Sequence, residues 1–450
     1  MKKDELFYIT LLLVHVGMGF LFFFVPFIGT IYGVLVVLIG IGYVVNTANR
    51  NNEVLLMAAY CTGMDVYLKM IGASLLNEYG KYTVIVFILL GIFYRGFNKG
   101  SFLYGFFIAL LIPGIYIGVE TLSFEADIRK AIAFNITGPV CLAVSAIYCF
   151  KRAISLQRLQ DVLAMFLFPL VALTINLFLF APSTKDVVTG TGSNFATSGG
   201  FGPNQVATVL GLAMFIAFTR LFLSSPTKKL QLINAFMVMV FAYRGIITFS
   251  RGGMLTGIVM IVVFLGVMYF ILDLKGKGKL LLTGGLSVLA GLLIFGYSSI
   301  QTGGLIEKRY ANKNARGIEK SDVLTGRGEL VSTEWNMFVD NPYFGVGVGR
   351  NKEIRAEETG IEAASHNEIT RMFAEHGSLG ILGLLILFTT PIVLYMNDRT
   401  QIFALVFMVF WIMTINHAAM RIAAPGFVYA LALLKVYFPK EEEVEAVSLR

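Results

Sequence analysis

Two short stretches in the second half of the chain place cationic and imidazole groups at the edge of apolar runs. They are Thr248-Phe249-Ser250-Arg251-Gly252-Gly253 and Ser365-His366-Asn367. An ionisable side chain near lipid is tolerated only if it pairs with another group or faces water, so each stretch is a candidate functional site. A guanidinium followed by two glycines suits a large anionic ligand such as a diphosphate headgroup. The imidazole of His366 suits a general base that acts on a hydroxyl, and Asn367 or Glu368 could orient it.

Other cations extend this set. Arg244 lies seven residues before Arg251, two turns along one expected helix face, so the pair could form a cationic ladder leading into the outer leaflet. Arg327 stands between glycines and could make a bidentate phosphate contact. His417 and Arg421 are four residues apart and are predicted to share a helix face. The alternatives are snorkelling of Arg251, pairing of Arg244 with a carboxylate or carbonyl inside the bundle, and an ordinary surface position for Arg327.

The elements that must position these residues are membrane-spanning helices. The chain has 450 residues, of which 56% are hydrophobic and only 14% charged, and its mean hydropathy is +0.75. Only helices and closed barrels satisfy the backbone in lipid. Segments such as 380–389 are apolar on every face, whereas barrel strands would alternate. The composition therefore predicts an all-α polytopic membrane protein with about 12 to 14 transmembrane helices.

The predicted spans and the basic residues between them set the topology. The spans are 7–28, 30–46, 53–72, 81–97, 101–118, 131–150, 162–181, 203–223, 230–249, 252–273, 279–300, 377–397, 401–417 and 422–438. Lysines and arginines fall in alternate connections, which the positive-inside rule assigns to the cytoplasm. Both termini are then cytoplasmic, and the connections at 190–203, 250–251 and 301–376 face outward.

The same pattern divides the chain into four parts. Residues 1–300 form the first part of the transmembrane bundle, and residues 301–376 are the one stretch long enough for a soluble loop subdomain. Residues 377–438 form the last helices of the bundle. Residues 439–450 contain the run Glu441-Glu442-Glu443 and are expected to be a cytoplasmic tail.

Several function classes are disfavoured. The sequence contains no H-E-x-x-H, no Cys/His cluster and no G-x-S-x-G, which argues against a zinc protease and a serine hydrolase. The net charge of +8 is explained by lysines and arginines beside anionic lipid and needs no nucleic-acid partner. A transporter of lipid-linked glycans would place functional residues near the bilayer midplane, whereas most candidates here lie at the outer rim.

Taken together, the motifs resemble the bacterial O-antigen ligase family, which also contains O-antigen polymerases. The resemblance rests on residues 249–255, on Arg327 ahead of Trp335, and on 341–349 with its alternating glycines. It also rests on Ser365-His366-Asn367 ahead of residues 375–380, and on the earlier Pro203-Asn204. These motifs cover about 200–390, and the first half of the chain resembles the family only in hydropathy.

The resemblance implies a GT-C-like inner-membrane glycosyltransferase with a large periplasmic loop and an active site facing the periplasm. Such an enzyme transfers a glycan from undecaprenyl diphosphate to an acceptor hydroxyl without a metal or other cofactor. Arg251 and Arg327 would hold the diphosphate, and His366 would align or deprotonate the acceptor. Substrate-binding roles fall to the polar residues around them, namely Asn204, Arg244, Asn367, His417 and Arg421.

The expected partners are the lipid-linked donor, a lipid-linked or glycolipid acceptor, and membrane lipids. A lipid A core sugar as acceptor would make the enzyme a ligase, and another lipid-linked repeat unit would make it a polymerase. The two activities need the same donor contacts, so the sequence leaves both open. A single displacement would invert the anomeric configuration, and no paired carboxylates at glycosidase spacing suggest a covalent intermediate.

Overall fold

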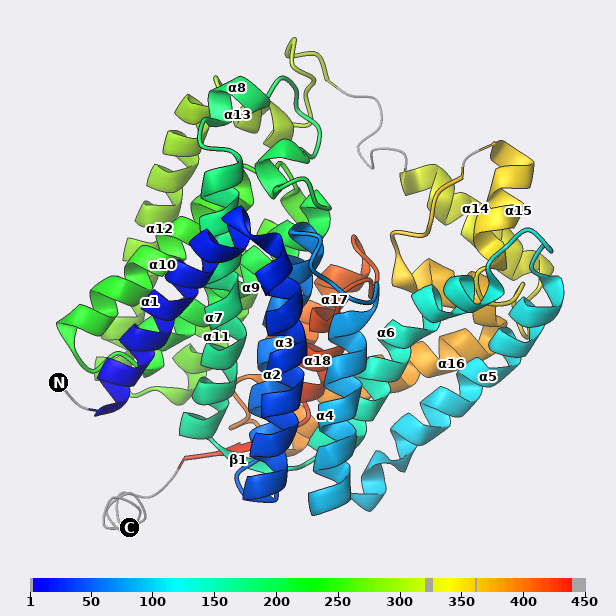
Figure 1. Cartoon of the computed structure of the whole chain (residues 1–450), viewed down its shortest axis with the longest axis horizontal. Coiled ribbons are helices and arrows are strands. Elements are labelled where there is room, and N and C mark those ends of the chain that lie inside the picture. The colour runs from blue at the N-terminus through cyan, green and yellow to red at the C-terminus, as the bar shows by residue number, and fades with distance from the viewer. Residues whose placement is uncertain (1–2, 320–326, 361, 439–450) are drawn as a thin grey trace.

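The structure is a computed structural model, and it describes residues 3–319, 327–360 and 362–438. Within these ranges the chain is almost entirely helical (Figure 1). Two short strands, β1 (Ala153–Ser155) and β2 (Lys435–Tyr437), pair in parallel at one end of the bundle. The predicted all-α membrane fold is confirmed.

Nine helices of the described chain are long and apolar enough to cross a membrane. They are α1 (Lys3–Phe24), α2 (Pro26–Thr47), α5 (Phe102–Thr121), α6 (Ile128–Cys149), α7 (Leu156–Phe180), α9 (Pro203–Leu223), α11 (Arg251–Ile271), α12 (Leu274–Gln301) and α16 (Glu368–Asn397). The other predicted spans correspond to α3 (Glu53–Met70), α4 (Tyr79–Arg95), α10 (Lys228–Ile246), α17 (Ala404–Ile415) and α18 (Ala423–Leu431). Each predicted span therefore has a helix at its centre.

The last two predicted spans are wrong in length. Helix α17 has 12 residues and so reaches only about 18 Å along its axis, against about 30 Å of hydrocarbon. Helix α18 has 9 residues and ends at Leu431, well before the predicted end at residue 438. Mostly apolar residues continue past the end of α18 through residues 432–438, which is why hydropathy alone extends the predicted span beyond the helix.

Small residues let the central helices approach closely. Helix α9 packs against α10 and α11, and α3 packs against α4 and α7. A Cβ on Gly211 of α9 would lie 2.3 Å from the carbonyl oxygen of Gly253, and a Cβ on Gly257 would lie 2.5 Å from the carbonyl oxygen of Gly211. This backbone contact is the usual way for helices to associate in a membrane, where apolar burial alone gives little preference. Helix α12, by contrast, is mostly exposed at the edge of the bundle.

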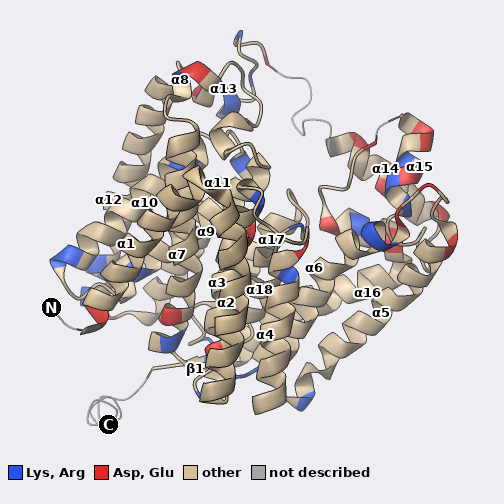
Figure 2. Ribbon diagram, in the orientation of Figure 1, with Lys and Arg blue, Asp and Glu red and all other residues tan. Residues whose placement is uncertain are grey.

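The basic connections gather at one end of the bundle, which we call the basic end. Arg95 Nε donates to the carbonyl oxygen of Asn49 at 3.1 Å, and Arg152 Nη2 donates to that of Gly96 at 2.6 Å. The β1–β2 pair adds the last described residues to the same end. Figure 2 shows charged residues concentrated toward the two ends of the bundle and in α14 (Arg327–Asp340) and α15 (Arg350–Thr359).

The opposite end, here called the loop end, carries the long connections. It holds α8 (Thr184–Val187), α13 (Leu305–Tyr310), α14 and α15 (Figure 1). Helix α16 begins here and is broken at Gly377, where φ is 57° and ψ is −138°. The break agrees with the predicted re-entry of the chain at residue 377. The division into subdomains stays a prediction, and residues 439–450, expected to be a tail, lie outside the described residues.

The alternating glycines at 345, 347 and 349 have a packing role. All three have positive φ, between 73° and 93°. A Cβ on Gly347 would lie 2.5 Å from the backbone nitrogen of Gly118 in α5, and Val348 N donates to the carbonyl oxygen of Gly114 at 2.9 Å. These glycines therefore form a tight backbone turn that packs on α5.

Candidate functional site

A tight turn joins α10 to α11 and places Arg251 at the first position of α11. Thr248 Oγ1 donates to the carbonyl oxygen of Gly245 at 2.7 Å. Phe249 is fully buried and takes a left-handed φ of 60°, which reverses the chain direction. Arg251 is half-buried, and its Nη1 donates to the carbonyl oxygen of Arg309 at 3.4 Å.

A second arginine, Arg309 of α13, lies on the same turn. Its Nε donates to the carbonyl oxygen of Phe249 at 3.0 Å. Burial raises the pKa of the neighbouring Tyr310, and the charges of Arg251 and Arg309 oppose that rise. The sequence analysis missed Arg309, because the run Glu307-Lys308-Arg309 has the composition of an exposed loop helix and carries no motif.

The two glycines after Arg251 serve packing and do not simply leave the guanidinium open. A Cβ on Gly252 would lie 2.7 Å from the ring of His417, and a Cβ on Gly253 would lie 2.3 Å from the backbone of Ala207 in α9. Any larger residue at Gly253 would push α9 and α11 apart. These glycines therefore set the position of Arg251 relative to His417 and α9.

His417 follows α17 and packs on the first turn of α11. Its Nδ1 lies 2.7 Å from the carbonyl oxygen of Met413, and its Nε2 lies 3.2 Å from Thr208 Oγ1. A carbonyl can only accept, so Nδ1 carries a hydrogen. The expectation that His417 and Arg421 share a helix face is wrong, because α17 ends at Ile415 and the chain continues as a loop.

Asn204 ties the beginning of α9 to the same turn. Its Oδ1 accepts a hydrogen bond from Ser250 Oγ at 2.8 Å, directly before Arg251. Its backbone oxygen accepts from Thr208 Oγ1 at 2.7 Å. Asn204, Arg251 and His417 therefore belong to one connected group of contacts at the loop end.

Residues 364–367, the histidine turn, dock on residues 416–421, the docking loop. Arg421 Nη2 donates to the carbonyl oxygen of Ala364 at 3.2 Å and to that of Ser365 at 2.5 Å. Asn367 Nδ2 donates to Asn416 Oδ1 at 3.4 Å. His366 lies between these contacts and is half-buried. One end of the docking loop thus places His417 near Arg251. Its other end bonds to the backbone of the histidine turn.

The two residues proposed to orient His366 have other partners. Asn367 caps α16, because its Oδ1 accepts from the backbone nitrogen of Ile369 at 2.9 Å and from that of Thr370 at 3.4 Å. Glu368 forms a buried ion pair with Arg371, which also pairs with Glu375. Asn367 and Glu368 therefore fix the start of α16. The start of α16 in turn sets the position of the histidine turn, which lies directly before it.

Glu334 of α14 connects this region to the helices of the loop end. It is 1% exposed and pairs with fully buried Arg355 of α15 at 2.6 Å. It also accepts from Thr370 Oγ1 at 2.5 Å and from Ser365 Oγ at 3.3 Å. Burial raises the pKa of Glu334, and the Thr370 hydrogen bond and the Arg355 charge oppose that rise. The carboxylate therefore contacts the residues on both sides of His366.

Arg244 and Arg327 stand apart from this group. Arg244 lies on α10 and Arg251 on α11, so the predicted ladder on one helix face is wrong. The Arg244 side chain is 1% exposed and donates to the carbonyl oxygens of Leu177 at 2.8 Å and Thr197 at 3.3 Å. This is the carbonyl pairing inside the bundle that the sequence left as the alternative. Arg327 is the first residue of α14, and its side chain lies outside the description.

Buried charged side chains of α3 and α4 bond to the backbone in and just after the docking loop. Lys81 is fully buried, pairs with Glu78, and donates to the carbonyl oxygen of Met420 at 3.2 Å. Asp65 pairs with Lys69 at 2.9 Å and also accepts from the backbone nitrogen of Ala423 at 3.0 Å. Residues 420 and 423 are therefore held by side chains from α3 and α4. No sequence motif pointed to these long-range contacts.

The structure thus brings Asn204, Arg251, His366, Asn367, His417 and Arg421 into one connected region at the loop end. Within the described ranges, no group of three or more His, Cys, Asp or Glu residues could hold a metal ion. Comparison with protein families shows that residues 235–385 match the family model described as O-Antigen ligase. No curated protein matches the chain. The matched segment contains Arg251, Arg327, His366 and Asn367 and confirms the family resemblance.

Proposed function

Because residues 235–385 carry an O-antigen ligase domain in a polytopic membrane protein, we propose that the chain transfers a glycan from undecaprenyl diphosphate to an acceptor hydroxyl. The observation that carries this proposal is the docking loop. It packs His417 on Gly252, next to Arg251, and bonds Arg421 to Ser365, next to His366. A cationic site and an imidazole from distant parts of the chain are joined through six residues of loop.

Arg251 and Arg327 hold the donor diphosphate in this proposal. When the bond between the anomeric carbon and the diphosphate oxygen breaks, the electron pair leaves with the diphosphate and negative charge builds on it. Preorganised guanidiniums stabilise such charge, and they cost no reorganisation during the reaction. Arg309 adds a second guanidinium to the turn that carries Arg251. Its side chain and that of Arg251 are both held by backbone carbonyls, which supports a preorganised cationic site.

His366 deprotonates the acceptor. The acceptor hydroxyl oxygen forms the new bond to the anomeric carbon, and its proton passes to the His366 imidazole. A positioned base of this kind contributes about 100-fold to 10,000-fold. Attack opposite the departing diphosphate inverts the anomeric configuration. Asn367 and Arg421 fix the backbone on either side of His366, and Asn204 and His417 fix the turn of Arg251.

Arg244 remains a candidate only as a positioning residue. Its buried guanidinium bonds the carbonyl of Thr197, and Thr197 Oγ1 in turn donates to the carbonyl oxygen of Ile247 at 2.6 Å. It therefore supports the connection before α9 and the turn before Arg251. A direct contact with the diphosphate would require this side chain to leave two carbonyl partners.

The charge pattern supports an orientation. We assign the basic end to the cytoplasm and the loop end to the periplasm of the bacterial inner membrane, following the positive-inside rule. The last described residues pair with β1 beside Arg152, and Thr227 Oγ1 donates to Glu5 of α1 at 2.9 Å. Both observations support cytoplasmic termini. The site then faces the periplasm.

A transporter of lipid-linked glycans is less well supported. The buried charges at membrane depth, Asp65 with Lys69 and Glu78 with Lys81, are neutral pairs. Within these pairs, Lys81 and Asp65 bond to the backbone of residues 420 and 423. A transport path would need ionisable groups facing a cavity near the midplane.

The test is reconstitution. Purified protein is incubated with a polyprenyl-diphosphate glycan and either a lipid A core acceptor or no added acceptor, and the products are sized. One glycan added per core acceptor identifies ligation, the first alternative, and a ladder on the polyprenyl carrier identifies polymerisation. Arg251→Ala, Arg327→Ala and His366→Ala should each abolish transfer, whereas Arg316→Ala, an exposed arginine of the same connection, should not. Normal transfer by the triple variant would refute the proposal.

A further inference from the structure

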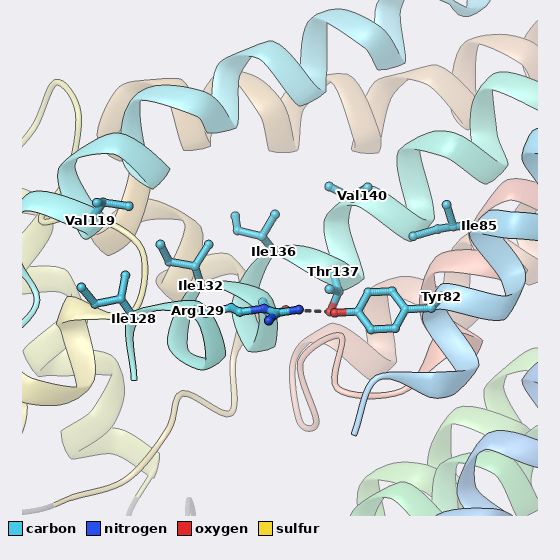
Figure 3. Close-up of a pocket in the computed structure, with 10 residues that line it drawn as sticks. Tyr82, Ile85, Val119, Ile128, Arg129, Ile132, Ile136, Thr137 and Val140 are labelled. Carbon is cyan, nitrogen blue, oxygen red and sulfur yellow. Dashed lines mark hydrogen bonds between the residues drawn. The ribbon is translucent and has the colours of Figure 1, made fainter. Parts of the chain in front are cut away.

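An apolar groove opens on the side of the bundle, between α4, α5 and α6 (Figure 3). Helices α4 and α5 lie together at the basic end and diverge toward the loop end, with α6 crossing between them (Figure 1). The groove has a volume of about 620 Å³. Its walls are branched aliphatic side chains, among them Ile85, Ile128, Ile132, Ile136 and Val140. Such a slot between membrane helices suits a hydrocarbon chain.

The groove continues into a polar basin at the loop end. The basin has a volume of about 1070 Å³ and shares Tyr82, Arg129 and Ala133 with the apolar groove. Figure 3 shows the side chains of Tyr82 and Arg129 pointing toward one another across the groove. At its other side the basin is lined by Ala364 and Ser365, the first residues of the histidine turn. One continuous hollow thus leads from the lipid-facing side of α6 to the residue before His366.

Charge is distributed unevenly along this hollow. Arg129 and Lys130 lie at the junction of groove and basin, at the start of α6. The basin beyond them is mainly acidic. Its carboxylates are Glu78, Glu125, Asp127, Glu353, Glu357 and Glu362. Four of them form ion pairs: Glu78 with Lys81, Glu353 and Glu357 with Arg350, and Glu362 with Lys352. An anionic group is therefore favoured at the junction, and uncharged or amino sugars, which donate hydrogen bonds to carboxylates, are favoured in the basin.

We propose that this hollow binds the acceptor, and that the acceptor is a saccharide carried on a single polyprenyl chain through a diphosphate. The chain lies in the groove, the diphosphate lies at Arg129 and Lys130, and the sugars cross the basin to His366. This inference rests on the proposed function and selects polymerisation over ligation to a core glycolipid. A core glycolipid carries several acyl chains, and the single slot between α4 and α6 accommodates one.

The arrangement separates the two substrates. The acceptor hydroxyl reaches His366 from the side of Ser365, while the donor diphosphate lies at Arg251, beyond the docking loop. In the transfer step the acceptor oxygen bonds to the donor anomeric carbon and its proton passes to His366. The donor undecaprenyl diphosphate leaves with the electron pair of the broken bond. The product remains attached to the acceptor lipid in the groove.

A kinetic experiment tests the acceptor assignment. The donor is a polyprenyl-diphosphate glycan whose terminal hydroxyl is blocked, so that it cannot act as acceptor. The acceptors are the same unblocked glycan on polyprenyl diphosphate, the glycan without lipid, and a core glycolipid. Ile132→Trp fills the groove and should raise KM for the polyprenyl-linked acceptor at least about tenfold, since two buried methylenes account for that much. Its kcat/KM for the lipid-free glycan should stay unchanged.

Two further variants sharpen this result. Arg129→Gln removes the cation at the junction and should also raise KM for the polyprenyl-linked acceptor, with little change for the lipid-free glycan. Leu286→Trp, on the exposed side of α12, is the matched control and should behave as wild type. The proposal is overturned if Ile132→Trp leaves the polyprenyl-linked acceptor unaffected, or if the core glycolipid is the preferred acceptor.

A binding experiment keeps the test independent of activity. Protein in phosphatidylglycerol vesicles is exposed to a polyprenyl phosphate that carries a photoreactive group on its chain. Labelled peptides should come from α4 and α6, labelling should fall in Ile132→Trp, and unlabelled polyprenyl diphosphate should compete. Labelling that added phosphatidylglycerol removes equally well would mean that bulk lipid fills the groove, and would refute the inference. Competable labelling without transfer to any acceptor would refute the proposed function alone.

Discussion

Replacing Glu334 should detach the histidine turn from the helices of the loop end. Glu334→Ala leaves Arg355, which is 0% exposed, without its carboxylate partner. Removing one member of a buried ion pair costs about 3 to 5 kcal/mol. The same change removes the acceptor for Ser365 Oγ and Thr370 Oγ1, which flank His366. A displacement of the base by about 1 Å can lower the rate about 100-fold.

The assay combines limited proteolysis with transfer kinetics. Glu334→Ala should expose α14 and α15 to protease and reduce kcat about 100-fold, with little change in KM for the donor. Glu334→Gln retains one acceptor oxygen and should show a smaller loss. Glu329→Ala, an exposed glutamate on the same helix, is the matched control. A double variant with Arg355→Met should recover much of the protease resistance, because it removes the unpaired buried charge.

Two outcomes would refute this reasoning. If Glu334→Ala is as resistant to protease and as active as wild type, the buried pair does not hold the histidine turn. If the double variant is no more resistant than Glu334→Ala, the cost does not arise from the unpaired guanidinium. A loss of resistance without any loss of kcat would show that Glu334 supports the fold but does not position His366.

Three further predictions follow from other contacts. Gly253→Leu should lower the free energy of unfolding in detergent by about 1 to 3 kcal/mol or more, because a Cβ there would lie 2.3 Å from the Ala207 backbone. The control Gly266→Leu has open space around it and should leave the free energy of unfolding unchanged. Arg421→Lys should reduce kcat about tenfold or more while insertion is normal, since the shorter lysine side chain lacks the planar guanidinium that places Nη2 on both carbonyl oxygens. Unchanged kcat would contradict the role of Arg421. The pKa of Glu334 is raised above 4.5 in the fold, so the folded state binds this proton more tightly than the unfolded chain does. The free energy of unfolding should therefore fall by this pH-dependent amount as the pH rises from about 4.5 through the folded pKa, while the ionised Glu334 stays paired with Arg355. Protease resistance of wild type should therefore fall over that range relative to Glu334→Gln, and parallel pH profiles would disprove the assignment.

The membrane fold was predictable because it depends on local properties. A run of apolar residues long enough to cross lipid must become a helix wherever it stands in the chain, so each predicted span has a helix at its centre. The ends of α17 and α18 were not predictable in this way. Contacts from other helices fix the chain between them, since Lys81 of α4 donates to the carbonyl oxygen of Met420 and Asp65 of α3 accepts from the backbone nitrogen of Ala423.

Several residues of the candidate site were predictable from the sequence, but the contacts between them were not. Arg251, His366 and Asn367 stand in motifs that can be read one at a time. The glycines beside Arg251 were assigned to ligand access, whereas they admit His417 and α9. Arg244 was placed with Arg251 because their spacing fits one helix, but the Phe249 turn puts them on separate helices. Arg309 and Glu334 carry no motif, so only their contacts reveal them.

By itself, the order of residues determined that this chain spans a membrane many times, which ends of its helices carry the basic residues, and which polar groups are candidates for chemistry. These three properties depend on the free energy of placing each side chain and peptide group in lipid or in water. That free energy is set by each segment's own residues and not by the rest of the chain. Tertiary structure decided which candidates meet. The docking loop joins Arg421 to Ser365 and His417 to Gly252 across long stretches of chain, and such pairings depend on the packing of the whole bundle.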